Sequence, residues 1–76
     1  MVTVYTRKGC PWCIKLKSYL KNNNISYDEI DVGENLAAYD VLVKESNQSG
    51  VPVININGCY IVGFDKSSID KALNIT

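Results

Sequence analysis

Two cysteines, Cys10 and Cys13, lie where the sequence pattern changes from that of a strand to that of a helix. The run Val2–Thr6 before them is apolar and β-branched, whereas residues 14–20 after them repeat apolar side chains at helical spacing. Pro11 suits the first position of a helix, because its missing N–H would have no partner there. The pattern therefore predicts that a strand leads directly into a helix and that Cys10 caps this helix.

The cap position has a chemical consequence for Cys10. The free amides and the partial positive charge of a helix N-terminus favour a thiolate, and thiol pKa values of roughly 3.5 to 7.5 are typical there instead of about 8.5. Cys10 is therefore the candidate nucleophile. Cys13 follows one turn later, close enough to form a small ring with Cys10 but expected to be less exposed. It is the candidate resolving thiol.

Two other uses of this cysteine pair fit the sequence less well. A zinc site needs four ligands, but the chain has no histidine and only one further cysteine, Cys59. Such a site would need a carboxylate or a second chain to complete it. A structural disulfide of a secreted protein is disfavoured by the odd number of cysteines and by the lack of an apolar signal segment. Redox chemistry is the favoured interpretation.

Neither charge nor hydropathy points to a nucleic-acid or membrane partner. The 8 basic residues balance 8 acidic ones, and no apolar stretch approaches the ~20 residues of a membrane span. The 76 residues fit one domain, residues 1–76, whose core is small but can be built from a chain that is 46% hydrophobic. We expect a monomeric cytoplasmic protein.

The first helix is expected to pack one face on a sheet. It begins at Pro11 and ends at asparagines 22–24, since asparagine tolerates the left-handed conformation that closes helices. Ile25–Val32 alternates apolar and polar residues in part and is predicted to be a strand parallel to Val2–Thr6. The inward face of the helix carries Cys13, Leu16 and Leu20.

A second helix is predicted over Glu34–Glu45, after Gly33 ends the strand. Its first residue places a carboxylate near the positive end of the helix. The role of this helix is structural, because it covers the sheet. The residues expected to face the sheet are spaced by three and four, and they are Leu36, Tyr39, Val43 and, as a further candidate, Leu42.

The C-terminal part predicts a hairpin and a third helix. Val51–Ile56 is a strand that its proline can only begin, because proline has no N–H for the ladder. Asn57-Gly58 fits a type I′ turn, and Cys59–Val62 returns as the antiparallel partner. In this partner strand Cys59 is expected to be a small buried apolar residue. A last helix, Lys66–Asn74, is expected to bury Ile69, Ala72 and Leu73.

The segment Thr6-Arg7-Lys8-Gly9-Cys10-Pro11-Trp12-Cys13 resembles the active-site segment of dithiol glutaredoxins, in which a Cys-Pro-aromatic-Cys motif opens the first helix. The predicted element order, β-α-β-α-β-β-α, agrees with this family. The resemblance implies a thioredoxin-like α/β fold, a four-stranded mixed sheet flanked by three helices. It also implies the strand order second, first, third, fourth.

The same resemblance implies a groove for glutathione. In the family a Val-Pro step with a cis-proline faces the redox cysteines, and Val51-Pro52 stands in that place. Gly63-Phe64-Asp65 stands at the family's Gly-Gly-x-Asp corner, although Val62 replaces the first glycine and would narrow the groove. Asp65 also suits a helix cap. The implied glutathione-binding residues are Lys8, Trp12, Val51, Pro52, Gly63, Phe64 and Asp65.

The activity that the resemblance implies is thiol–disulfide exchange. Cys10 and Cys13 would reduce glutathione mixed disulfides and protein disulfides, with glutathione as reductant and co-substrate and with no permanently bound cofactor or metal. The short chain and Gly63-Phe64 are similar instead to the redoxins that supply ribonucleotide reductase and are reduced by thioredoxin reductase. A third hypothesis is an iron–sulfur carrier, in which two chains bridge a cluster through Cys10 with glutathione as co-ligand.

Overall fold

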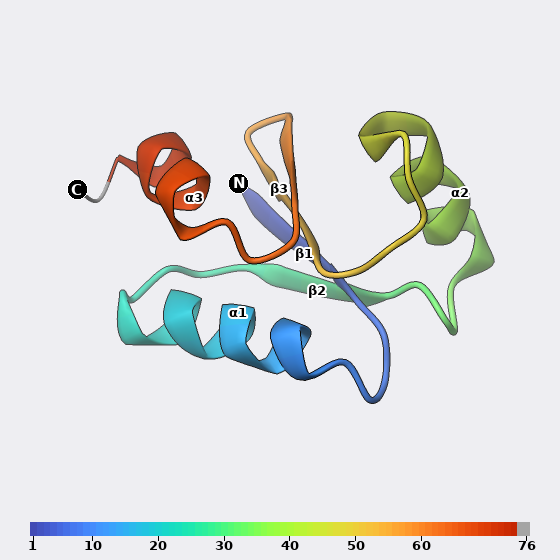
Figure 1. The fold of residues 1–76 in the computed structure, drawn as a ribbon, viewed down its shortest axis with the longest axis horizontal. Helices are drawn as coiled ribbons and strands as arrows, with labels where there is room; N and C mark the ends of the chain where they lie inside the picture. The colour runs from blue at the N-terminus through green and yellow to red at the C-terminus, as the bar shows by residue number, and fades with distance from the viewer. Residues whose placement is uncertain (75–76) are drawn as a thin grey trace.

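A mixed β-sheet forms the centre of the computed structural model, which describes residues 1–74 (Figure 1). Its strand order is β2-β1-β3-β4, as predicted. Among the helices of this part of the chain, none combines the length and the apolar character of a membrane span. The elements within residues 1–74, in the predicted order, are β1 (Val2–Thr6), α1 (Pro11–Asn22), β2 (Asp28–Asp31), α2 (Leu36–Ser46), β3 (Val53–Ile56), β4 (Cys59–Val62) and α3 (Lys66–Leu73).

Strand β1 lies between two neighbours that run in different directions. It pairs in parallel with β2, with Tyr5 opposite Ile30, and antiparallel with β3, with Tyr5 opposite Val53. Strand β4 continues the sheet antiparallel to β3. Because side chains alternate along a strand, Val4 and Ile54 enter the core on one face while Tyr5 and Val53 enter the core on the other. The central strands are therefore buried on both faces.

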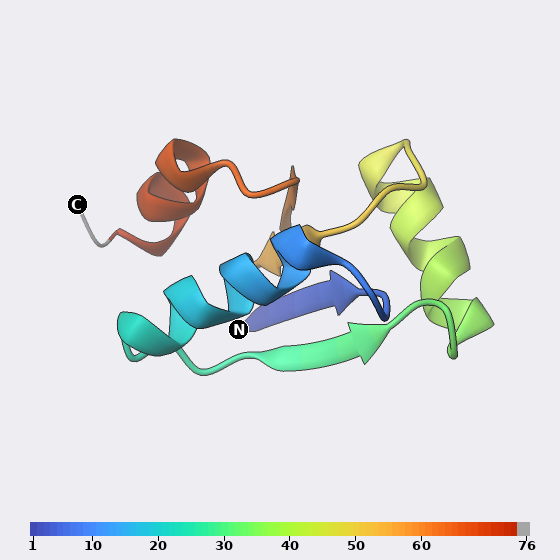
Figure 2. The same cartoon turned by 60° about the horizontal axis from the view of Figure 1, so that its bottom comes forward.

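The helices cover the two faces of the sheet unequally. Helices α1 and α3 pack on one face, where α1 contributes Leu16 and Leu20 to the core and α3 contributes Ile69. Figure 2 shows α1 lying along β1 and β2. Helix α2 packs on the other face through Ala38 and Leu42. The predicted inward face of α1 is confirmed, since its three residues are all buried.

Two strands are shorter than predicted. Strand β2 covers Asp28–Asp31 instead of Ile25–Val32, because the backbone N–H of Ile25 donates to the carbonyl of Leu20 at 2.9 Å and so closes α1. Strand β3 begins at Val53, two residues later than predicted. The proline before it cannot donate to the ladder, which is why the paired segment starts only after that residue.

Two helix boundaries also differ from the prediction. Helix α2 begins at Leu36 rather than at Glu34, because Asn35 is the cap and its side-chain oxygen accepts a 3.0 Å hydrogen bond from the amide of Ala38. Helix α3 ends one residue early, because Asn74 takes the left-handed conformation (φ 59°) that closes it. The predicted cap of α3, Asp65, is confirmed.

The predicted inward face of α2 is wrong in two of its residues. Leu36 is 74% exposed and Val43 is exposed as well, whereas Ala38 and Leu42 are buried and Tyr39 is half-buried. The helix carries apolar residues at most of its first eight positions, so spacing alone does not select one face. Contact with the sheet selects it. The pair four residues apart, Ala38 and Leu42, meets the core on that side.

The prediction for Cys59 is also wrong, because this residue is exposed. Cys59 is the first residue of β4, an edge strand. Ile61 lies two positions further on the same face and is buried, but at Cys59 the surface opens into a cavity that Lys71 and Ala72 of α3 also line. The short last helix does not cover the beginning of the strand.

A polar contact that the sequence did not predict joins α1 to α3. Asp70 is buried and accepts a hydrogen bond from the Tyr19 hydroxyl, and the Lys66 ammonium lies 3.1 Å from its other oxygen. The hydrogen bond from Tyr19, together with Lys66, holds the pKa of Asp70 below its ordinary value despite the opposing effect of burial. The buried carboxylate of Asp70 therefore links α1 to α3 on one face of the sheet.

Substituting single leucines of α2 by alanine tests which face of this helix packs on the sheet. We expect Leu42→Ala to lower the free energy of unfolding by about 2–4 kcal/mol, because it leaves a cavity in the core, and the exposed control Leu36→Ala to change it by less than about 0.5 kcal/mol. Chemical denaturation followed by circular dichroism measures both values. Equal effects of the two substitutions would mean that the helix is rotated.

The link at Asp70 predicts a pH dependence of stability. A carboxyl whose pKa is lowered by folding stabilises the protein above about pH 4, and this contribution is lost as the pH falls through the lowered value. We expect Asp70→Asn to melt at a lower temperature than the wild type at neutral pH, with a smaller difference at about pH 3. The matched control is Asp40→Asn, at an exposed position of α2. A difference that stays constant with pH would contradict this role of Asp70.

Candidate active site

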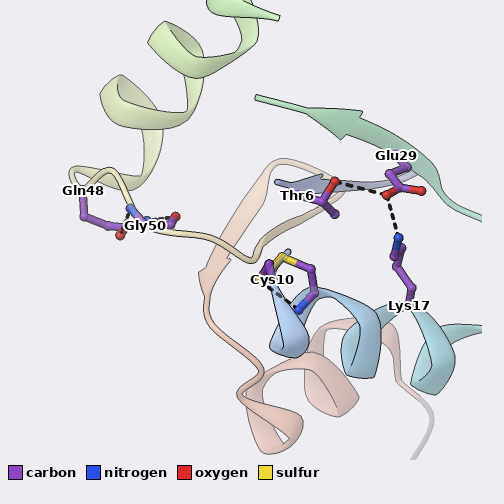
Figure 3. Close-up of a disulfide and its surroundings, with 7 residues drawn as sticks. Thr6, Cys10, Lys17, Glu29, Gln48 and Gly50 are labelled. Carbon is purple, nitrogen blue, oxygen red and sulfur yellow. Dashed lines mark hydrogen bonds and ion pairs between the residues drawn. A yellow bond between two sulfur atoms is a disulfide. The ribbon is translucent and has the colours of Figure 1, made fainter. Parts of the chain in front are cut away.

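Cys10 and Cys13 are joined by a disulfide at the start of α1 (Figure 3). Cys10 is the N-cap residue, with an extended backbone, and Pro11 follows at the first helical position, as predicted. The amide of Cys13 donates to Sγ of Cys10 at 3.1 Å. This is the hydrogen bond that a capping side chain normally accepts, and in the reduced protein the same amide would favour a thiolate at Cys10.

The two sulfurs differ in their access to solvent. Cys13 is buried against the sheet, whereas Cys10 is half-buried. The difference follows from position, because the cap residue stands outside the helix and Cys13 lies one turn inside, on the face that carries Leu16 and Leu20. A disulfide partner from outside the chain therefore reaches Cys10 first.

Beside the cysteine pair lies a hollow of about 310 Å³, here called the groove. The Val51-Pro52 bond is cis, as predicted, and the carbonyl of Pro52 accepts a 2.8 Å hydrogen bond from the amide of Gly63. This bond joins the loop before β3 to the corner after β4. Gly63 has a φ of 76°, a conformation that favours glycine. The groove is lined by Trp12, Val51, Pro52, Gly63 and Phe64.

Aromatic rings form two walls of the groove. Trp12 is 55% exposed, and the ammonium of Lys15 lies 4.4 Å from its ring centroid, a cation–π distance. Phe64 is half-buried, and its ring packs against that of Tyr19 with the centroids 5.5 Å apart. The link at Asp70 holds Tyr19, so the contact between α1 and α3 also supports this wall.

The loop that leads to Val51 is ordered by one side chain. The side-chain amide of Gln48 accepts from the amide of Gly50 at 2.6 Å and donates to the carbonyl of the same residue at 3.0 Å (Figure 3). Both backbone groups of Gly50 are thereby paired just before the Val-Pro step. This pair of hydrogen bonds was not predicted from the sequence.

Asp65 does not line the groove. Its carboxylate caps α3, accepting from the amide of Ser68 at 3.3 Å and from the Ser68 hydroxyl at 2.8 Å. It borders instead the larger cavity that Cys59 and Val62 also line. The predicted role as helix cap is confirmed, whereas a role in ligand binding stays a prediction. Val62, which replaces a glycine of the family corner, is 47% exposed.

Lys8 lies at another, smaller cavity of about 200 Å³, here called the charged cavity. Its ammonium is 2.9 Å from the carboxylate of Glu34, and both side chains are largely exposed. Such an exposed pair is weak and is easily exchanged for another anion. Because both cysteines line the same cavity as Lys8, the structure brings Lys8 to the cysteines but not into the groove. The lining of the charged cavity includes Thr6, Lys8, Cys10, Cys13, Lys17 and Glu29.

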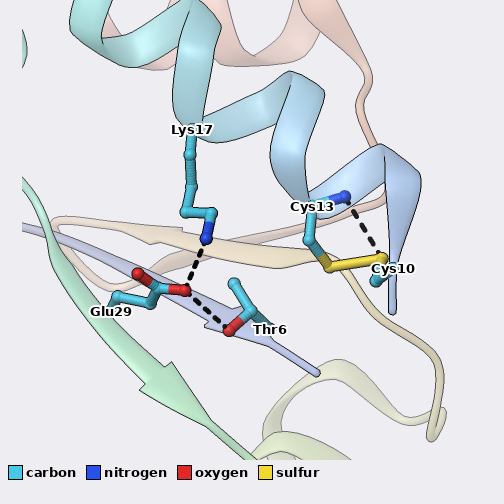
Figure 4. Close-up of polar contacts among 5 residues, drawn as sticks. All are labelled: Thr6, Cys10, Cys13, Lys17 and Glu29. Atoms are coloured by element: carbon cyan, nitrogen blue, oxygen red, sulfur yellow. Dashed lines mark hydrogen bonds and ion pairs between the residues drawn. A yellow bond between two sulfur atoms is a disulfide. The ribbon is translucent and has the colours of Figure 1, made fainter. Parts of the chain in front are cut away.

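Three side chains of the charged cavity form a polar contact that the sequence did not predict. The Lys17 ammonium lies 2.7 Å from Oε2 of Glu29, and the Thr6 hydroxyl donates to the same oxygen at 3.1 Å (Figure 4). The hydrogen bond from Lys17 lowers the pKa of Glu29, and Thr6 acts in the same direction. The sequence held a signal for Lys17, because a residue four positions after Cys13 lies on the same face of the helix. Nothing local in the sequence points to Glu29.

Comparison with known proteins agrees with this arrangement. The family model described as Glutaredoxin matches residues 2–61. The chain is 45% identical, over 96% of its length and 97% of the other, to an uncharacterised glutaredoxin-like 8.6 kDa protein in the rubredoxin operon of Clostridium pasteurianum. It is 33% identical to glutaredoxin 3 of Escherichia coli, covering 84% of this chain and 77% of that protein.

A solved structure is similar to this chain in both fold and sequence. The thioredoxin-like protein BC3987 superposes with a TM-score of 0.88 at 32% identity, and the match covers 95% of this chain and 99% of that one. The thioredoxin-like α/β fold is therefore confirmed, and it carries the redox-active cysteine pair at the start of α1. Since the family model covers most of the sequence and the relatives match over most of their length, the chain belongs to the glutaredoxin family.

Proposed function

We propose that this chain reduces glutathione mixed disulfides and protein disulfides through Cys10 and Cys13, with glutathione as the reductant. The observation that carries the proposal is the position of Cys10, a half-buried sulfur at the start of a helix, next to a groove walled by Trp12 and Pro52. A thiolate at that position is available to a disulfide held in the groove. No bound cofactor is needed for this exchange.

The reaction begins at Cys10. Its thiolate attacks a glutathione mixed disulfide, forms a disulfide between Cys10 and the glutathione sulfur, and releases the substrate as a thiolate that takes a proton from water. A second glutathione then attacks the adduct, which yields glutathione disulfide and restores the Cys10 thiolate. With a protein disulfide, Cys10 attacks first, forms a mixed disulfide with one substrate sulfur and releases the other as a thiolate. Cys13 then attacks Sγ of Cys10, so that the Cys10–Cys13 disulfide forms and the second substrate thiolate leaves. Two molecules of glutathione reduce this disulfide afterwards and are released as glutathione disulfide.

The groove offers backbone groups to an extended peptide. Val51 is half-buried and lies outside the paired segment of β3, which starts at Val53. A tripeptide such as glutathione pairs with backbone groups of this kind in the manner of an added strand. The exposed ammonium of Lys8 supports binding of a glycyl carboxylate, because its pair with Glu34 costs little to exchange. Asp65 is exposed outside the groove, two residues after Gly63, where it would pair with the α-amino group of glutathione.

One observation favours a second candidate function. Val62 stands in place of the first glycine of the family corner and is 47% exposed, so a branched side chain lies next to Gly63. A branched side chain there restricts the approach of glutathione to the corner amides. A redoxin that receives electrons from thioredoxin reductase and passes them to ribonucleotide reductase would not need those amides.

Single cysteine exchanges test the assignment of the two sulfurs. We expect Cys10→Ser to abolish turnover with every disulfide, because it removes the nucleophile. Cys13→Ser should keep the reduction of a small glutathione mixed disulfide and lose the reduction of protein disulfides. The matched control is Cys59→Ser, which removes an exposed thiol remote in sequence and should leave both rates unchanged. If Cys10→Ser remains active, the nucleophile is another group.

The choice of reductant is tested by coupled NADPH oxidation. One assay contains glutathione and glutathione reductase, and the other contains thioredoxin reductase alone, with the same disulfide substrate in both. We expect turnover in the first assay. Turnover in the second assay only would reject glutathione as reductant and establish the redoxin function.

Val62→Gly should raise the glutathione-dependent rate if the valine side chain restricts the corner.

A further inference from the structure

The charged cavity places an ion pair close to the buried sulfur of Cys13. Lys17 follows Cys13 by four residues, so both side chains leave α1 on the same face, one turn apart. Figure 4 shows Lys17 pointing from α1 toward the sheet, where it meets Glu29, while the side chain of Cys13 joins that of Cys10. The four side chains line one cavity of about 200 Å³.

The ion pair is held by three groups on three elements. Lys17 comes from α1 and Glu29 from β2, and their 2.7 Å contact is joined at 3.1 Å by the hydroxyl of Thr6, the last residue of β1. The side chains of Lys17 and Glu29 are 27% and 41% exposed, so solvent screens part of their charge. Thr6 is buried, which anchors Glu29 to the centre of the sheet.

Both sulfurs border the charged cavity, but Cys13 lacks the cap position that favours a thiolate at Cys10. It lies inside the helix rather than at the cap, and burial of a thiol disfavours the thiolate that must attack. The Lys17 ammonium favours this thiolate and the Glu29 carboxylate opposes it. Other charged groups also border the cavity, namely Arg7 and Lys8 after β1 and Asp31 of β2.

We propose that the Lys17–Glu29 ion pair sets the ionisation of Cys13 and thereby the rate of the resolving step. This rests on the proposed function, of which that step is a part. In it the Cys13 thiol gives its proton to water and its thiolate attacks Sγ of Cys10 in the mixed disulfide. The Cys10–Cys13 bond forms, the bond from Cys10 to the substrate sulfur breaks, and the released thiolate takes up a proton.

The first experiment measures the pKa of Cys13 alone. In a Cys10→Ser/Cys59→Ser background Cys13 is the remaining thiol, and its ultraviolet thiolate absorbance is titrated. Lys17→Met should raise its pKa by about half a pH unit, because Glu29 is then uncompensated, and Glu29→Gln should lower it by about the same amount. Lys17→Arg keeps the charge and should restore the wild-type value.

The second experiment measures the resolving step. The Cys59→Ser protein is loaded at Cys10 with β-mercaptoethanol, and the release of this thiol is followed in time. Lys17→Met should slow the release about twofold and Glu29→Gln should speed it about twofold, since the change in thiolate population is partly offset by the change in nucleophilicity. The matched control is Lys21→Met, in the last turn of α1, which should alter neither the pKa nor the rate.

Opposite shifts from the two substitutions support the proposal, because a purely structural effect would move both variants in the same direction. Unchanged Cys13 pKa values in both variants, or shifts of equal sign, would overturn it. If Lys17→Met does not fold, as judged by circular dichroism, Lys17→Gln provides the same test. The loading thiol has no peptide groups for the groove, so the result does not depend on whether glutathione is the reductant.

Discussion

The hydrogen bond from the amide of Cys13 to Sγ of Cys10 is the contact on which the site depends. It makes a cysteine the cap of α1, so the reactive sulfur takes the place of an ordinary capping oxygen and faces the positive end of the helix. The same geometry leaves Cys13 one turn inside, on the buried face of the helix. One local contact thus produces two cysteines with different exposure and different chemistry.

The sheet determines what lies around that sulfur. Because β3 runs antiparallel to β1, the segment before β3 arrives at the same end of the sheet at which β1 gives way to α1. This brings the Val51-Pro52 step to the cysteine pair. The bond from Gly63 to Pro52 then adds the corner after β4, and the contact of Tyr19 with Phe64 holds that corner against α1. Three segments distant in sequence form the groove in this way.

Charges near the two sulfurs are arranged differently. Near Cys10 the favourable field comes from backbone amides, which belong to the helix itself. Near Cys13 two side-chain charges of opposite sign, Lys17 and Glu29, border the same cavity, and Thr6 fixes the carboxylate. Backbone dipoles are a property of the fold, whereas a side-chain ion pair is changed by a single substitution. If the proposed role of the ion pair holds, the ionisation of Cys13 is the property that a single substitution changes.

Local signals in the sequence determined the helix start at Pro11, the cap at Cys10, the Asn57-Gly58 turn and the inward face of α1, because each depends on residues within one or two turns. Tertiary structure decided the face of α2 and the exposure of Cys59. In α2 apolar residues occur on several sides, and at Cys59 burial depends on how far another element extends. It also decided the partners of Lys17 and Tyr19, which lie 12 and 51 residues away in the chain. Contacts at such separations follow from how the elements pack, and no local pattern encodes them.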